Sequence, residues 1–125
     1  MATIKSYTDL QQSKKLAEIL PLESADMYYE PSAGFCTEPS EVRFGDIKYA
    51  HPRSIRCWSL AALLEQLPYE VCDDDENSIY LQIDKEGDVY RLVYTDTYED
   101  FEIIETDRYE HFVDACYEMI VKLPN

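Results

Sequence analysis

Residues 79–94 read IYLQIDKEGDVYRLVY. Apolar and polar residues alternate through the first six positions, and this period of two is typical of a strand with one buried face. Lys85–Asp88 contains a glycine and predicts a turn, after which Val89–Tyr94 returns as a second strand. The segment therefore predicts an antiparallel β-hairpin. Its core face is expected to carry Ile79, Leu81 and Ile83, and its other face Tyr80, Gln82 and Asp84.

Helix signals lie on both sides of the hairpin. The segment Thr8–Gln11 has the spacing of a capping box, and Pro21 is expected to end the first helix. Ser59 is expected to cap a second helix that ends at Pro68. A third helix is expected over residues 107–123, where apolar residues recur at helical spacing.

The remaining segments complete an α+β pattern. Further strands are expected within residues 25–30, 42–49 and 101–105, and residues 31–42 are expected to form a loop. Strands that follow each other through short turns favour an antiparallel meander over parallel crossovers. We therefore expect one globular domain over residues 1–125, an antiparallel β-meander sheet with about three helices packed on one face.

The helices and the hairpin are expected to share one core. Each apolar stripe is too narrow to stabilise its own element, so each must be buried against the others. The second and last helices should therefore lie on the same side of the hairpin. The residues expected in this core are Trp58, Leu60, Leu63, Leu64, Ile79, Leu81, Ile83, Phe112, Cys116, Met119 and Ile120.

Several segments together carry a family resemblance. They are WSLAALLE at 58–65 followed by Leu67-Pro68, LQID at 81–84, YRLVY at 90–94 and FVDACYEMI at 112–120. They resemble a family of small uncharacterised proteins encoded by gut bacteria and by their phages or mobile elements. The similarity covers roughly residues 55–123. Because the shared motifs are apolar stripes without reactive groups, the resemblance implies an architecture and transfers no activity.

Negative charge is concentrated in the second half of the chain. Residues 1–68 carry 7 Lys/Arg against 9 Asp/Glu, a net charge of −2. Residues 69–125 carry 4 Lys/Arg against 17 Asp/Glu, a net charge of −13. A field of this sign repels nucleic acid and anionic membranes and attracts cations. We therefore expect a cationic protein partner, with no direct binding to nucleic acid and no membrane contact.

The four cysteines and the N-terminus bear on the compartment. Cysteines stand at positions 36, 57, 72 and 116, without a C-x-x-C pair, so neither a zinc ribbon nor a dense disulfide framework is indicated. Reduced thiols are typical of cytosolic proteins. The first residues lack the apolar segment of a signal peptide, and no apolar run approaches the roughly 20 residues of a membrane span. We expect a cytoplasmic protein.

Few residues have the pattern of a metal or cofactor site. Residues 73–84 have the outline of a calcium loop, but Ser78 and Asp84 occupy the places that require glycine and a bidentate glutamate. A solvated acidic loop is the better interpretation. The two histidines and three glycines provide neither a zinc-binding histidine cluster nor a phosphate-binding glycine loop. We expect no metal, no cofactor and no enzymatic activity.

An alternative function centres on Cys57. This cysteine precedes the second helix, and His51 and Arg53 lie in the basic loop before it. A helix N-terminus can lower the pKa of a thiol and can bind an anion. The alternative is therefore a small-ligand or anion-binding protein, or a thiol enzyme, with its site in this region. A packing role for Cys57 is the simpler interpretation.

The main functional prediction rests on carboxylates and tyrosines. On a helix over residues 107–123, four carboxylates would share one arc of about 80° opposite the apolar stripe. The chain also has 11 tyrosines, and exposed tyrosines are enriched at protein interfaces. We predict a non-enzymatic protein-binding module whose acidic C-terminal half meets a cationic partner, in a sharper version as a nucleic-acid mimic. The expected partner-binding residues are Asp107, Glu110, Asp114, Glu118, Tyr80 and Asp84.

A second copy of the chain is another candidate partner. Carboxylate stripes repel their own image, so a homodimer would have to form through the less acidic, tyrosine-containing N-terminal half.

Overall fold

Three α-helices and two antiparallel sheets make up the part of the chain that the structure describes. The structure is a computed structural model and describes residues 5–29, 42–44, 54–72, 78–95 and 102–123. In chain order the elements are α1 (Leu10–Ile19), the 3₁₀ turn η1 (Leu22–Ser24), β1 (Met27–Tyr29), β2 (Val42–Phe44), β3 (Ile55–Cys57), α2 (Leu60–Glu65), β4 (Glu70–Cys72), β5 (Ser78–Glu86), β6 (Val89–Thr95), β7 (Glu102–Glu105) and α3 (Phe112–Lys122).

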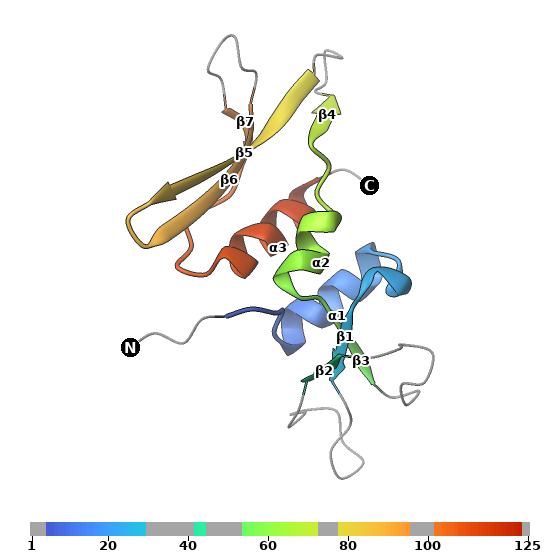
Figure 1. The fold of residues 1–125 in the computed structure, drawn as a ribbon. Helices are drawn as coiled ribbons and strands as arrows, with labels where there is room; N and C mark the ends of the chain where they lie inside the picture. Colours follow the sequence, from blue (N-terminus) through green and yellow to red (C-terminus); the bar gives the residue numbers. More distant parts are fainter. Residues whose placement is uncertain (1–4, 30–41, 45–53, 73–77, 96–101, 124–125) are drawn as a thin grey trace.

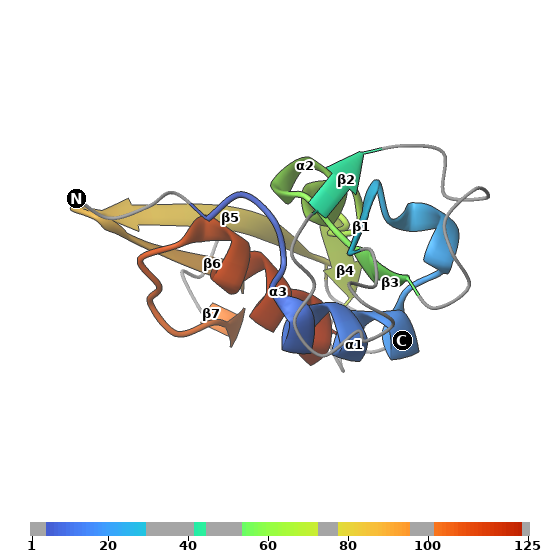
Figure 2. The ribbon, with the colours of Figure 1, turned by 90° about the horizontal axis from the view of Figure 1, so that it is seen from below.

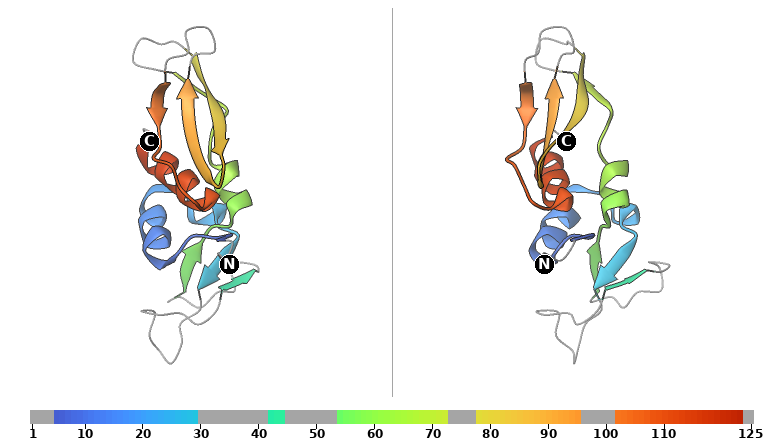
Figure 3. Two further views of the ribbon diagram at one scale, coloured as in Figure 1. Left: turned by 90° about the vertical axis from the view of Figure 1, so that its left-hand side faces the viewer. Right: turned by 60° about the vertical axis from the view of Figure 1, so that its left-hand side comes forward.

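The strands divide between two sheets at opposite ends of the molecule, with the helices between them (Figure 3). One sheet has the order β2-β1-β3 and the other the order β4-β5-β6-β7, and all neighbouring strands are antiparallel. The predicted α+β class with antiparallel strands is confirmed. The strands do not form a single meander, because α2 separates β3 from β4 and each group of strands pairs only within its own half.

The predicted hairpin is confirmed and is longer than the alternating pattern suggested. Strands β5 and β6 pair from Tyr80↔Thr95 to Glu86↔Val89, and Gly87 in the turn has a φ of 62°, a value that glycine adopts without strain. The hairpin projects beyond the helices (Figures 1 and 2). For this reason Ile83 is 50% exposed, and its predicted place in the core is wrong.

The main core lies between the helices and one face of the β4–β7 sheet. Helix α3 packs on β6 and α2 packs beside α3, so both helices are on the same side of the hairpin, as predicted. The buried members of the predicted core are Trp58, Leu63, Ile79, Cys116, Met119 and Ile120, and those partly buried against it are Leu60, Leu81 and Phe112. Leu64 is 37% exposed, and its predicted burial is wrong because its neighbour Leu63 occupies the core side of α2.

Helix caps follow the sequence closely, with one shift. Ser59 caps α2, as predicted, by accepting a hydrogen bond from the Ala62 N–H. The capping box of α1 is formed by Asp9 and Gln12, one residue later than predicted. Thr8 is buried, and its hydroxyl lies 2.8 Å from the Ser13 hydroxyl and accepts from the Trp58 N–H at 3.1 Å. That side chain is therefore engaged in the interior and leaves the cap to Asp9.

Helix α3 begins at Phe112, five residues later than predicted. The preceding segment instead continues the sheet, because Tyr109 and Tyr90 form an isolated antiparallel bridge. The Tyr90 N–H donates to the Tyr109 carbonyl at 2.7 Å, and the Tyr109 N–H donates to the Tyr90 carbonyl at 2.8 Å. A backbone group bonded across the sheet cannot also serve a helix, so residues 107–111 are not helical.

Candidate partner-binding surface

An exposed acidic surface of the described chain lies on the β5–β7 face that points away from the core. We call it the acidic face and define it by Gln82, Asp84, Glu86, Val89, Arg91 and Glu105. Opposed residues of an antiparallel pair share a face. The register Asp84↔Arg91 and Glu86↔Val89 joins β5 to β6, and Val93↔Glu105 joins β6 to β7. The predicted grouping of Gln82 and Asp84 on one face is confirmed.

Arg91 organises this face. Its Nη2 donates to Asp84 Oδ2 at 2.7 Å, and its Nη1 donates to Glu105 Oε2 at 3.1 Å. The Arg91 side chain is only 19% exposed, whereas those of Asp84 and Glu105 are 46% and 51% exposed. One guanidinium thus orients two carboxylates from two neighbouring strands, and about half of each of these acidic side chains is exposed.

The acidic face continues to the end of the hairpin. Glu86 is 80% exposed and pairs with Arg108 at 3.7 Å, a distance at which an exposed ion pair contributes little stability. A cavity of about 460 Å³ lies here, lined by Ile83, Asp84, Lys85, Glu86, Val89, Arg91 and Arg108. Toward the inner end of the hairpin, Val93 of β6 lies on the same face but is only 1% exposed. The open part of the face is therefore the outer half of the hairpin, together with Glu105.

Tyr80 lies at the inner end of this face. It is partly buried, and its ring packs against Tyr69 with the ring centroids 5.4 Å apart. Tyr69 is 72% exposed, which is the largest exposed fraction among the large hydrophobic residues of the described chain. Sequence reasoning missed Tyr69, whose only signal is its position after Pro68, beyond the apolar stripe of α2.

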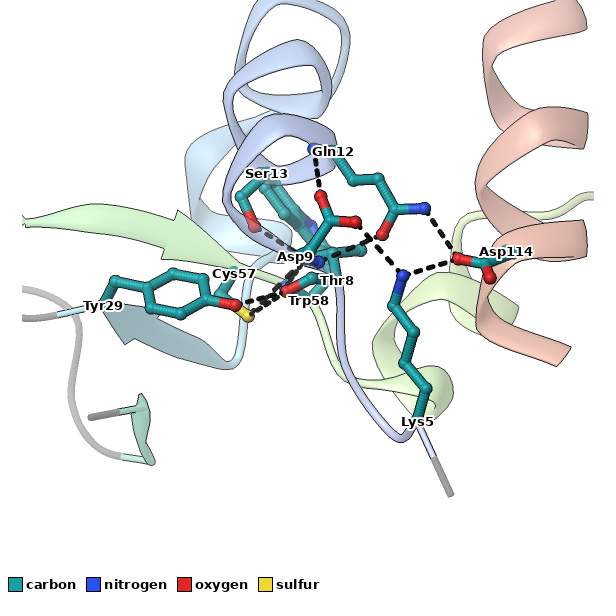
Figure 4. A network of polar contacts seen from close by, with 9 residues as sticks. All are labelled: Lys5, Thr8, Asp9, Gln12, Ser13, Tyr29, Cys57, Trp58 and Asp114. Atoms are coloured by element: carbon teal, nitrogen blue, oxygen red, sulfur yellow. Dashed lines mark hydrogen bonds and ion pairs between the residues drawn. The ribbon is translucent and has the colours of Figure 1, made fainter. Parts of the chain in front are cut away.

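The predicted stripe of four carboxylates along the last helix is wrong. Asp107 and Glu110 precede α3, since the helix starts at Phe112. Asp114 is in α3, but its Oδ1 accepts from Lys5 Nζ at 2.6 Å and from Gln12 Nε2 at 2.8 Å (Figure 4). These bonds join the N-terminal segment and α1 to α3. Asp114 therefore has a structural role, and its side chain is only 22% exposed.

Glu118 is also engaged within the chain. Its carboxylate accepts from the Asp107 N–H and from the Tyr109 hydroxyl, both at 2.8 Å, and its side chain is only 19% exposed. Burial, together with the neighbouring Glu118 carboxylate, raises the pKa of Tyr109 to about 12. Glu118 thus anchors the segment that leads into α3. Of the six predicted partner-binding residues, Asp84 lies on the acidic face and Tyr80 at its inner end, whereas Asp107, Glu110, Asp114 and Glu118 lie outside it.

Cys57 lacks the surroundings of a reactive thiol. It is fully buried, and its Sγ lies 3.5 Å from the Thr8 hydroxyl and donates to the Thr8 carbonyl at 3.4 Å (Figure 4). Burial raises the pKa of the Cys57 thiol, the opposite of the activation that nucleophilic catalysis requires. The Tyr29 hydroxyl donates to the same Thr8 carbonyl. Cys57 is thus a packing residue, while His51 and Arg53 lie outside the described residues.

The described residues contain no group of three or more His, Cys, Asp or Glu side chains that would hold a metal ion. The Asp73–Asn77 part of the acidic loop lies outside the described residues. Counting its four acidic residues, seven of the 17 acidic residues in positions 69–125 lie outside the described ranges. Within the same described ranges, no helix has the length and apolarity to cross a membrane.

Comparison with protein-family models, with curated proteins and with solved structures found no match to this chain. The resemblance to a family from gut bacteria and their mobile elements therefore stays a prediction.

Proposed function

We propose that this protein is a non-enzymatic binding module whose acidic face meets a cationic partner protein. The observation that supports this most strongly is the arrangement of Asp84, Arg91 and Glu105. Because one guanidinium already orients both carboxylates, less side-chain entropy is lost when a partner binds them. The net charge of −15 adds a long-range attraction that speeds the encounter with a basic surface.

The shape of the hairpin and the exposed tyrosine support the same proposal. The hairpin extends beyond the helices, so a partner can reach the acidic face without moving another element of the described chain. Tyr69, packed on Tyr80, offers a large exposed ring at the inner end of the same sheet. Interfaces combine such rigid aromatic contacts with a polar rim.

A finer version of the proposal is that the protein mimics nucleic acid and occupies the basic groove of its partner. Fixed carboxylates on a projecting hairpin would then replace phosphates. Competition distinguishes this version from simple charge pairing. A short DNA duplex should displace the protein from its partner if the two share a groove, whereas binding that survives excess DNA would restrict the proposal to protein contact outside that groove.

The test compares two sets of matched charge changes. The face variant carries Asp84→Asn, Glu86→Gln and Glu105→Gln, and the control variant carries Glu18→Gln, Glu23→Gln and Glu65→Gln. Both change the net charge from −15 to −12, and both sets are exposed or partly exposed side chains. Asn and Gln keep an oxygen that can still accept from Arg91.

Tagged proteins would be incubated with lysate of the native host at 50 mM NaCl and washed into 0.5 M NaCl. We expect basic proteins to be retained at low salt and released at high salt, since salt screens exposed charges. For the captured partner, the face variant should bind about tenfold more weakly, about 0.5 kcal/mol for each lost charge. Equal affinities of the two variants, or retention of no basic protein at 50 mM NaCl, would refute the proposal.

A further inference from the structure

A second cavity, of about 560 Å³, lies in the N-terminal half, where three distant segments meet. The Ser6 carbonyl accepts from the Leu60 N–H at 3.0 Å, which aligns the N-terminal segment with the start of α2. The Asp26 carboxylate, just before β1, accepts from the Ser59 N–H at 2.9 Å. The cavity is lined by Ser6, Tyr7, Asp26, Met27, Ser59, Leu60 and Ala61.

Among the residues that the structure describes, Asp26 is the one charged residue that lines this cavity. Its Oδ1 accepts a hydrogen bond from the Ser59 N–H, and its Oδ2 accepts one from the Ser59 hydroxyl. A carboxylate has about four acceptor positions, so the two bonds fix its orientation and leave capacity on both oxygens. Within the described ranges, no lysine or arginine forms an ion pair with Asp26.

The other walls suit a side chain with an apolar stem and a flat cationic head. Met27 is buried, while Leu60 and Ala61 provide partly buried and exposed apolar surface for methylene groups. Tyr7 is 37% exposed, and its ring makes a T-shaped contact with the Tyr29 ring, with centroids 6.4 Å apart. A guanidinium stacks on such a ring and presents two parallel N–H groups to a carboxylate.

We propose that this cavity binds the arginine side chain of a protein or peptide, with the guanidinium on Asp26 and Tyr7 and the methylene stem on Leu60 and Ala61. Arginine fits better than lysine, since its fork can use both Asp26 oxygens and its plane can lie on the Tyr7 ring. This site lies outside the acidic face, so it does not depend on the function proposed above.

Small probes test the site without any knowledge of the natural partner. The ¹⁵N-labelled protein would be titrated with acetyl-arginine methylamide, and its acetyl-lysine and acetyl-norleucine counterparts would report on charge and on the apolar stem. We expect saturable amide shifts at Tyr7, Met27 and Ser59 with the arginine probe, and at least tenfold weaker binding of the norleucine probe. Equal binding of the norleucine or the lysine probe would overturn the assignment to arginine.

Variants separate this site from the acidic face. Asp26→Asn keeps two polar atoms next to Ser59 and should weaken the arginine probe about tenfold, whereas Tyr7→Leu should weaken it about two- to fivefold and leaves the carboxylate intact. Glu23→Gln, an exposed neighbour in η1, and Asp84→Asn, on the acidic face, should change nothing at this cavity. Arginine-induced shifts that occur only on β5–β7, or that survive in both cavity variants, would refute the site while leaving the acidic face in place.

Discussion

Leucines 63 and 64 stand side by side on α2 and should respond very differently to truncation. Leu63 is 0% exposed within the core, so Leu63→Ala removes buried methyl groups and leaves a cavity, at a cost of about 2–5 kcal/mol. Leu64 is 37% exposed, so Leu64→Ala loses only part of the transfer free energy and leaves no closed cavity, at a cost of about 1 kcal/mol. The same chemical change thus reports which side of the helix faces the core.

Urea unfolding measures the difference. Trp58 is the single tryptophan and is fully buried, and its indole N–H donates to the Ser24 hydroxyl at 3.0 Å, so its fluorescence reports on the core next to α2. With an m-value of about 1–3 kcal/mol/M, Leu63→Ala should lower the midpoint by about 1–2 M, and Leu64→Ala by less than half as much. Equal shifts, or a larger shift for Leu64→Ala, would show that the faces of α2 are assigned backwards.

Three further predictions concern charge and protonation. Glu118→Gln should lower the free energy of unfolding by about 1–2 kcal/mol, because Glu118 accepts two internal hydrogen bonds. The control Glu110→Gln removes an exposed carboxylate outside the helix and should change the free energy of unfolding by no more than about 0.5 kcal/mol. Equal urea midpoints for the two variants would contradict this difference. Arg91→Gln should destabilise by about 1 kcal/mol at 50 mM NaCl and by less at 1 M NaCl, and a salt-independent loss would argue against an electrostatic role. Burial raises the pKa values of Tyr94 and Cys116 to about 12, from ordinary values of 10.0 and 9.0, so the unfolded chain loses these protons at lower pH than the folded chain and the free energy of unfolding should fall between about pH 9 and pH 12. In a series of urea midpoints, Tyr94→Phe should flatten the upper part of that decline. An unchanged slope would contradict the assignment.

The local parts of the fold could be predicted from the sequence. Strict alternation identified β5, the turn at Lys85–Asp88 identified β6 as its hairpin partner, and Ser59 marked the start of α2. Strand faces, tight turns and helix caps all depend on residues a few positions apart. The start of α3 was missed because the bridge between Tyr90 and Tyr109 depends on strand pairing rather than on local sequence. No local sequence pattern predicts such a bridge.

Tertiary choices among equivalent residues could not be predicted. Thr8 and Asp9 both suit an N-cap, and the interior network that engages Thr8 decides between them. Leu63 and Leu64 are neighbours in one apolar stripe, and the position of α3 decides which is buried.

The candidate surface was predicted only in part, for the same reason. The alternation placed Asp84 and Tyr80 on the face away from the core, but the contribution of Arg91 and Glu105 needed the strand register. Asp114 looked like a free carboxylate of an amphipathic helix, and its partners Lys5 and Gln12 come from more than 100 positions earlier in the chain. Abundant acidic residues make it impossible to tell structural carboxylates from exposed ones by sequence alone.

Mapping where the captured partner touches this protein would show directly whether the acidic face is the binding surface. Amide shifts of the ¹⁵N-labelled protein would be recorded with and without the unlabelled partner at 50 mM NaCl. We expect the largest changes at Gln82, Asp84, Glu86, Arg91 and Glu105, and we expect them to diminish at 0.5 M NaCl. Changes confined to α1 and to the β1–β3 sheet, or changes insensitive to salt, would contradict the claim that the acidic face is the binding surface.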